Sequence, residues 1–172
     1  MILRAATHDD IPAIARVHVD TWRTTYQGIF PDEVLQRMTY QQREQGWRSI
    51  FAGALEKEQF TYVSENPHGQ IIGFAYGGLE RGGHSVYQGE LYALYILEAY
   101  QRQGIGRQLV QAIAHQLAQM NIQTLLVWVL EDNPACRFYE AIGGQKVAQK
   151  AIARGGATLT EVAYGWTDTS GL

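Results

Sequence analysis

Residues 101–107 read QRQGIGR and place two glycines and two arginines in front of a segment with helical periodicity. The first residues of a helix present unpaired backbone N–H groups and a partial positive charge, so this junction can bind an anion. Gly104 and Gly106 would let a ligand approach the backbone closely, and Arg102 and Arg107 could add charge-assisted hydrogen bonds. These residue types are therefore suited to binding a phosphate group. For a bare Gly-x-Gly pair, a tight turn without any ligand is the commoner explanation.

Two well-known phosphate-binding motifs do not match this junction. The dinucleotide-binding fingerprint needs a third glycine where this chain has Leu109, and it needs an acidic residue that Thr124–Leu130 lacks. A Walker loop needs a Gly-Lys-Ser or Gly-Lys-Thr sequence, which does not follow here. The sequence therefore disfavours a dinucleotide site of the Rossmann type and a nucleoside triphosphate site of the P-loop type.

The junction lies between an expected strand and an expected helix. Glu90–Leu97 is an apolar, tyrosine-rich strand candidate, and apolar residues recur at helical spacing over Gly104–Met120. The next strand candidate, Thr124–Leu130, ends in an uninterrupted apolar run, which is typical of a strand buried on both faces. A strand, a helix and a second strand in this order predict two parallel strands with a right-handed connection.

Further helices and strands surround this unit. Helices are expected over the apolar stripe from Ile11 to Trp22 and at Pro31–Leu35, Gln41–Ala54 and Pro134–Ile142. The glycine pairs at 77–78 and 82–83 are expected to flank a loop. The other strand candidates are Ile2–Ala6, Phe60–Ser64, Ile71–Tyr76, Gln145–Ala153 and Leu159–Trp166, with a turn at Gly155-Gly156.

These elements predict an α/β fold in a single domain that spans residues 1–172. The hairpins near both ends of the chain imply antiparallel pairing, whereas the unit around Gly104 implies one parallel pair. We therefore expect a mixed, mostly antiparallel central sheet of about six to seven strands with helices on both faces.

The composition narrows the class of protein further. The chain has 172 residues, of which 46% are hydrophobic, so it can bury a core of its own. A net charge of −3 leaves no broad basic surface for nucleic acid. The sequence opens without the pattern of a signal peptide, and its longest apolar run, Leu125–Leu130, is too short to cross a bilayer. We expect a soluble, cytoplasmic protein that binds neither nucleic acid nor membrane.

Metal binding and thiol chemistry are not indicated. The single cysteine, Cys136, excludes an internal disulfide framework and has no recognisable Cys-His partner motif. The five histidines show no metal-ligand spacing, so no metal site is predicted. His18 lies on an apolar helical stripe, which is typical of a packing residue, while His84 lies on a glycine-rich loop.

Four stretches of the chain resemble the GNAT superfamily of N-acetyltransferases. Residues 101–106 are similar to the acyl-CoA pyrophosphate signature Q/R-x-x-G-x-G/A of that family. Residues 90–96 are similar to its fourth strand, and residues 22–29 to a variant of its first-helix region. Residues 133–144, which include a Phe-Tyr-Glu sequence, resemble its later helix. The resemblance covers essentially the whole chain, and the order of the elements matches.

The resemblance implies acetyl-CoA as the co-substrate and a splay between the fourth and fifth strands, the fourth being bulged. The pantetheine arm would enter this gap and pair with strand backbone, and the pyrophosphate would lie on the N–H groups at the start of the next helix. The cofactor-binding residues implied in this way are Leu94, Tyr95, Ile96, Arg102, Gln103, Gly104, Ile105, Gly106, Arg107 and Asn133.

The resemblance also implies the catalytic residues Glu90 and Tyr139. Glu90 lies four residues before Leu94, where several family members carry a glutamate that takes the amine's proton or orients the ammonium ion. Tyr139 would protonate the leaving thiolate of CoA. Without the resemblance, Glu90 could be a solvent-facing carboxylate at a strand end, and Tyr139 a packed aromatic residue beside Phe138. Asn133 could bind the CoA arm or cap the helix that contains Pro134.

Aromatic residues supply candidates for the acceptor pocket. Together with a carboxylate, aromatic rings suit a cationic amine, although rings at helical or strand spacing are more often part of the core. The candidates are Trp22, Tyr26, Phe30, Tyr76 and Trp128, with Glu90 at the bottom of the pocket. A small primary amine is the first expected acceptor and a peptide amine the next. Because family members often dimerise, a homodimer is a further expectation.

Three functions remain open at this point. The first is an acetyl-CoA-dependent N-acetyltransferase that moves the acetyl group to a primary amine by direct attack in a ternary complex. The second is a non-catalytic acyl-CoA-binding sensor, which would retain the glycine junction while Glu90 and Tyr139 did no chemistry. The third is a nucleotide-binding module unrelated to CoA, which the missing fingerprint disfavours.

Overall fold

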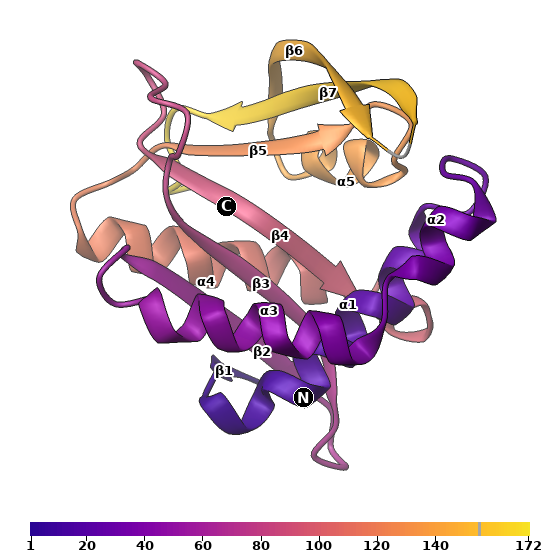
Figure 1. Cartoon of the computed structure of the whole chain (residues 1–172). Coiled ribbons are helices and arrows are strands. Elements are labelled where there is room, and N and C mark those ends of the chain that lie inside the picture. The colour runs from indigo at the N-terminus through magenta and orange to yellow at the C-terminus, as the bar shows by residue number, and fades with distance from the viewer. Residues whose placement is uncertain (155) are drawn as a thin grey trace.

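The computed structural model describes residues 1–154 and 156–172, whose strands form one mixed sheet in the order β1-β2-β3-β4-β5-β7-β6 (Figure 1). All neighbouring strands in this sheet pair antiparallel except β4 and β5, which run parallel. The strands are β1 (Ile2–Ala5), β2 (Gln59–Glu65), β3 (Ile71–Leu79), β4 (Gly89–Ile96), β5 (Leu125–Leu130), β6 (Gln145–Arg154) and β7 (Ala157–Trp166). The expected mixed, mostly antiparallel sheet is confirmed, and the turn expected at residues 155–156 falls partly outside the described residues.

Helices cover both faces of the sheet. On one face lie α1 and α3, and on the other lie α4 and α5 (Figure 1). Apolar side chains of α4 and of β3, β4 and β5 form the larger core cluster, and α1 packs with α3, β2 and β3 in a second cluster. The helices are α1 (Ile11–Thr25), α2 (Asp32–Arg37), α3 (Tyr40–Gly53), α4 (Ile105–Gln119) and α5 (Ala135–Ala141), with short 3-10 turns at His8–Asp10 and Glu98–Tyr100.

The parallel pair opens after a short paired stretch. Gly89, Glu90 and Leu91 of β4 pair with β5, but the strands then diverge, and β4 continues to Ile96 without a partner on that side (Figure 1). The pairing of β3 with β4 shifts at Tyr92, which is the bulged residue. The splay and the bulge that the family resemblance implied are both present. The splay exposes one edge of the β4 backbone, which a ligand can reach.

One expected loop begins later along the chain than the sequence suggested. Gly77 and Gly78 were expected to flank it, but they lie inside β3, which ends at Leu79. A Cβ atom at Gly77 would lie 2.8 Å from the Glu90 carbonyl oxygen, and one at Gly78 would lie 2.6 Å from the Glu58 carbonyl oxygen. These glycines therefore permit close approach of neighbouring backbone rather than a turn.

In the part of the chain that the structure describes, no helix combines the length and the apolar character that a membrane span requires. Among the same residues, no three His, Cys, Asp or Glu side chains are grouped so that they could hold a metal ion.

Candidate active site

The glycine junction forms the start of α4. Gly104 precedes the helix with φ +81°, a left-handed conformation that glycine adopts without strain. The first hydrogen bond of the helix runs from the Gln108 N–H to the Gly104 carbonyl oxygen over 3.2 Å. The N–H groups of the residues between them therefore precede the helical hydrogen-bond ladder and are available to an anion.

Gly106 lets α5 pack closely against α4. A Cβ atom there would lie 3.1 Å and 3.2 Å from two ring atoms of Phe138 and 3.4 Å from Ile96. A larger residue would have to displace the Phe138 ring or project into the space between the two helices. The second glycine of the motif is thus required by packing as well as by any ligand.

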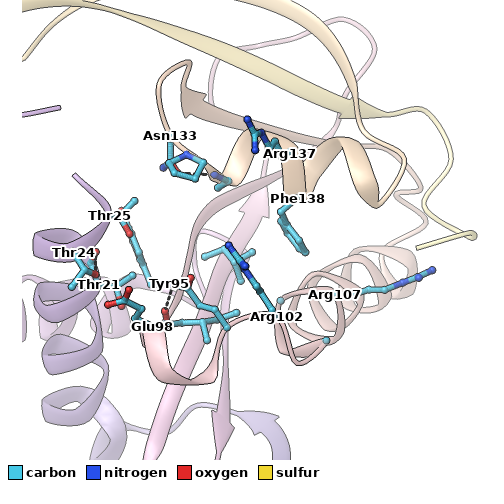
Figure 2. A pocket seen from close by; sticks show the side chains of 17 residues that line it. Thr21, Thr24, Thr25, Tyr95, Glu98, Arg102, Arg107, Asn133, Arg137 and Phe138 are labelled. Atoms are coloured by element: carbon cyan, nitrogen blue, oxygen red, sulfur yellow. Dashed lines mark hydrogen bonds between the residues drawn. The ribbon is translucent and has the colours of Figure 1, made fainter. Parts of the chain in front are cut away.

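A cleft of about 720 Å³ joins the start of α4 to the splay between β4 and β5 (Figure 2). One wall comes from the last turns of α1, the floor from β4, and the other wall from α5 and the residue pair that precedes it. The lining residues are Thr21, Thr24, Thr25, Leu94, Tyr95, Ile96, Glu98, Gln101, Arg102, Gly104, Gly106, Arg107, Asn133, Pro134, Ala135, Arg137 and Phe138.

Glutamine side chains hold the loop between β4 and α4 in place. The Gln101 amide donates to the Ile96 carbonyl oxygen over 2.9 Å, and the Gln103 amide donates to the Ala99 carbonyl oxygen over 3.2 Å. Gln101 therefore fixes the loop geometry at the end of β4, and this role accounts for the residue without a ligand.

The structure brings the residues predicted to bind the cofactor into this one cleft, with two exceptions. Gln103 is exposed and is engaged by the Ala99 carbonyl oxygen, and Ile105 is buried in the core cluster beneath α4. The backbone N–H groups of both residues still belong to the loop and helix start at the mouth of the cleft. The side chains at these two positions therefore do not contribute to the cleft.

Several lining residues were missed by sequence reasoning. Thr21, Thr24 and Thr25 lie at helical spacing on one face of α1, which is a signal that could have been read from the sequence. Arg137 faces the cleft from α5, on the side opposite Arg102 (Figure 2). No pattern in the sequence distinguishes Arg137 from an ordinary exposed arginine.

Asn133 makes two contacts near the splay. Its Oδ1 accepts a hydrogen bond of 2.9 Å from the Ala135 N–H, and its Nδ2 donates to the Tyr26 hydroxyl over 3.4 Å. The capping role considered for Asn133 is therefore present, and the residue also lines the cleft. Tyr26 in turn is within hydrogen-bonding reach of the Tyr95 hydroxyl, and burial raises the pKa of both phenols.

Tyr139 lies behind this group of phenols. Its side chain is only 4% exposed and packs against Tyr164 and Trp166, with ring centroids at 6.0 Å and 6.3 Å. Burial raises the pKa of the Tyr139 phenol, and the nearby Tyr26 and Cys136 raise it further. The phenol therefore keeps its proton at neutral pH. Tyr139 is not part of the cleft lining, although its neighbour Phe138 is.

Glu90 is bound to an arginine of the β3–β4 loop. It is 4% exposed; its Oε2 accepts 3.1 Å hydrogen bonds from the N–H and the Nε of Arg81, and its Oε1 accepts a 2.6 Å bond from Nη2. The Arg81 guanidinium lies 3.9 Å from the Tyr92 ring centroid, and the Tyr92 and Tyr76 rings are 4.8 Å apart. We refer to Glu90, Arg81, Tyr92 and Tyr76 as the Glu90 cluster. Glu90 does not line the cleft.

The five aromatic candidates for the acceptor pocket do not form one box. Trp22, Tyr26 and Phe30 pack together, with ring centroids 4.3–5.5 Å apart. Tyr76 belongs to the Glu90 cluster and also contacts Trp47 on α3. Trp128 lies elsewhere on β5, with the Lys150 ammonium 3.9 Å from its ring centroid.

The splayed parallel strands and the glycine-rich helix start at their mouth are the features of a CoA-dependent acyltransferase. A family model described as FR47-like protein matches residues 79–153. The uncharacterized N-acetyltransferase YuaI of Bacillus subtilis is 40% identical over 170 residues, which is 99% of this chain and 95% of YuaI. The chain belongs to the GNAT superfamily of N-acetyltransferases.

Solved structures agree with the fold. The PaiA N-acetyltransferase of Thermoplasma acidophilum, crystallised with coenzyme A, aligns with a TM-score of 0.71 at 20% identity over 93% of this chain and 96% of that one. YncA of Salmonella typhimurium, with its cofactor acetyl-CoA, aligns with a TM-score of 0.73 at 18% identity over 99% and 94% of the two chains.

Proposed function

We propose that this enzyme transfers an acetyl group from acetyl-CoA to a primary amine by direct attack in a ternary complex. The observation that carries the proposal is the cleft, which runs without interruption from the start of α4 to the splay. Two structural neighbours carry coenzyme A or acetyl-CoA, and both align over more than nine-tenths of this chain. The residues of the cleft suit the same ligand, because the phosphate-binding groups and the exposed strand edge lie at its two ends.

The phosphates are expected at the start of α4. The N–H groups from Arg102 to Arg107 lie at the positive end of the helix, and Arg102 and Arg137 reach the cleft from opposite sides. Guanidinium groups bind phosphate oxygens in a fork geometry, which backbone N–H groups cannot supply. Arg137 thus adds a phosphate contact that the motif alone does not include.

The pantetheine arm is expected along the unpaired edge of β4. After Leu91, β4 no longer pairs with β5, so N–H and C=O groups on that side are free to bind an extended ligand. One of the N–H groups near Leu94–Ile96 would also stabilise the oxyanion that forms when the amine nitrogen attacks the thioester carbon. The C–S bond then breaks, and the sulfur leaves as a thiolate.

Tyr139 and Glu90 are assigned the two proton transfers. Tyr139 keeps its proton at neutral pH and would donate it to the thiolate, which requires the buried phenol to become accessible from the cleft. Glu90 would take the proton of the amine, directly or through water. In the free protein, its two carboxylate oxygens are occupied by Arg81, so this role requires the arginine to move.

A cationic acceptor can replace Arg81 at Glu90. The site already holds a guanidinium between a carboxylate and an aromatic ring, which is the arrangement that attracts any organic cation. The Arg81 side chain is 56% exposed and lies beside Gly82 and Gly83, so it can swing into solvent. We infer that the ammonium group of the acceptor takes the place of the guanidinium and then loses its proton to Glu90.

The test is an acetyl-transfer assay that detects the free thiol of CoA. The purified protein is given acetyl-CoA and a panel of amines: a polyamine, an amino acid amide, an aminoglycoside and a peptide with a free N-terminus. Release of CoA that depends on one of these amines supports the proposal.

The occupied state of Glu90 also favours a second function, the non-catalytic acyl-CoA sensor. Calorimetric binding of acetyl-CoA without turnover of any amine would favour the sensor. Absence of binding to a folded protein would contradict both functions.

A further inference from the structure

Thr21 carries a buried hydroxyl that has no hydrogen-bond partner in the described part of the chain. The residue is 4% exposed and lies one turn before the end of α1. A threonine in a helix commonly donates to a carbonyl oxygen one turn earlier, as the hydroxyl of Thr24 does to the Asp20 and Thr21 carbonyls. A buried hydroxyl without a partner is destabilising, because its desolvation is not offset by a hydrogen bond.

Thr21 lies at the β4 end of the cleft. It is part of the cleft lining, and its helix neighbours His18 and Trp22 both pack near Tyr95, with the His18 ring stacked on Tyr95 at 4.8 Å. Figure 2 shows Thr21 on the α1 side of the cleft near Glu98, whereas Arg137 and Phe138 lie across from it. Thr21 is therefore close to the splay and separate from the arginine on α5.

The hydroxyl can turn toward a ligand without losing any bond. Threonine in a helix occupies two χ1 rotamers, and rotation between rotamers carries the hydroxyl to a different side of the Cβ atom. Because the Thr21 hydroxyl has no partner in its present position, the rotation breaks no hydrogen bond. A ligand in the cleft that offers a polar atom would thus gain a hydrogen bond at little energetic cost to the protein.

The charges around Thr21 select the kind of ligand group. Glu98 lines the same side of the cleft, and a carboxylate there disfavours an anionic group. Phosphates are better served by the N–H groups and arginines at the start of α4 and on α5. A neutral amide, which can both donate and accept, suits a lone hydroxyl beside the exposed edge of β4.

We propose that the Thr21 hydroxyl binds an amide group of the pantetheine arm of acyl-CoA. The inference rests on the proposed function and adds a binding residue from α1 to a site otherwise formed by β4, α4 and α5. The hydrogen bond fixes how far the arm enters the splay and so positions the thioester along β4.

The experiment compares Thr21→Val with Thr21→Ser. Valine has nearly the volume of threonine without the hydroxyl, and serine retains the hydroxyl. Each variant is titrated by calorimetry with CoA and with adenosine 3′,5′-bisphosphate, which has the nucleotide but no pantetheine. We expect Thr21→Val to bind CoA about five- to tenfold more weakly than the parent and to bind the bisphosphate equally well. Thr21→Ser should bind both like the parent.

Thermal unfolding of the free proteins gives a second, opposite signature. Removal of an unpaired buried hydroxyl should leave the Tm of Thr21→Val unchanged or raise it, while its CoA affinity falls. A side chain with a purely structural role would lower both together. If Thr21→Val does not fold, Thr21→Ala replaces it, with the same expected loss for CoA alone.

Three results would overturn the proposal. In the first, Thr21→Val binds CoA as tightly as the parent. In the second, it loses affinity equally for CoA and the bisphosphate, which would mean that Thr21 affects binding of the nucleotide and not of the pantetheine arm. A parent protein that folds and binds neither probe would overturn the proposed function itself, and the assignment of Thr21 with it.

Discussion

The cleft and the Glu90 cluster differ in how their polar groups are satisfied. In the cleft, the N–H groups at the start of α4 precede the helical ladder, the Thr21 hydroxyl lacks a partner, and Arg102 and Arg137 form no ion pair within the described residues. In the Glu90 cluster, the carboxylate is bound by Arg81, and the Tyr76 hydroxyl donates to the Gln59 amide oxygen. The polar groups of the cleft are available to a ligand, whereas those of the Glu90 cluster are already paired with one another. We call the cleft the open site and the Glu90 cluster the closed site.

This difference predicts an order of events. A ligand can enter the cleft without breaking any bond of the protein, so the donor can bind first. A ligand at Glu90 must displace Arg81 from a buried carboxylate, which requires a cation that binds the carboxylate comparably well. The enzyme would then expose its base only when a cationic acceptor is present.

The largest expected effect comes from filling the open site. Gly106→Val should weaken acetyl-CoA binding by about a hundredfold or more, since the new side chain would meet Phe138 and narrow the start of α4. Calorimetry measures the loss. Gly46→Val is the matched control: a Cβ atom there meets nothing within 4 Å, and Gly46 lies on α3, away from the cleft.

If Gly106→Val folds and binds acetyl-CoA like the parent, the glycine junction does not hold the cofactor. A loss of binding in Gly46→Val of similar size would instead mean that the assay reports general damage to the fold.

The second effect concerns Glu90 and Tyr139, the two residues proposed to transfer protons. Glu90→Gln and Tyr139→Phe should each lower kcat by about a hundredfold, because each substitution removes one proton transfer while nearly preserving side-chain volume. Steady-state rates with the best amine of the panel give kcat, and calorimetry gives the affinity for acetyl-CoA, which should not change.

Turnover by either variant at the rate of the parent would remove that residue from the mechanism. A fall in acetyl-CoA affinity with unchanged kcat would show that the residue shapes the cleft instead.

The third effect concerns the closed site, where Arg81 occupies the Glu90 carboxylate. Arg81→Gln removes the guanidinium that competes for Glu90, so the KM for the amine should fall by about three- to tenfold while kcat stays within about twofold. Arg81→Lys retains the competing charge and should keep the KM close to that of the parent. A KM that rises in Arg81→Gln would mean that Arg81 helps to bind the acceptor, which contradicts the exchange.

The open site was predictable from the sequence, because it depends on backbone. A glycine-rich helix start leaves N–H groups unpaired whatever the surrounding side chains are, so residues 101–107 predicted where the unpaired N–H groups of the cleft lie. The strand–helix–strand order likewise predicted the parallel pair. The three threonines that α1 contributes to the cleft were not predicted. Their spacing places them on one face of a helix, but how far that face reaches over β4 depends on the fold.

The closed site was less predictable because it depends on side-chain pairing. Nothing in the sequence marks Arg81 as the partner of Glu90, which lies on the next strand across a glycine-rich loop. The aromatic candidates failed to converge for a similar reason. Trp22, Tyr26 and Phe30 follow helical spacing and cluster, whereas Tyr76 and Trp128 lie on strands whose positions in the sheet only the fold defines.

The smallest effect tests whether the wall of the open site is rigid. Burial, together with the nearby charge of Arg43, lowers the pKa of His18 to about 3. The neutral ring accepts a 3.2 Å hydrogen bond from the Trp47 Nε1 and stacks on Tyr95. Because a histidine in the unfolded chain binds a proton near pH 6.5 and the folded one does not, the stabilising contribution of His18 is fully present above that pH.

As the pH falls from about 6.5 toward 3, this group alone should lower the free energy of unfolding by up to about 1.4 kcal/mol per pH unit. Urea unfolding between pH 7 and pH 5 measures the slope. His18→Gln should be less stable than the parent at pH 7, but its free energy of unfolding should depend less on pH. His68→Gln is the control, because His68 is exposed, and its pH dependence should equal that of the parent. Equal pH dependence in the parent and His18→Gln would mean that α1 shifts to accommodate a protonated His18 ring. The α1 wall of the cleft would then be less rigid than the structure indicates.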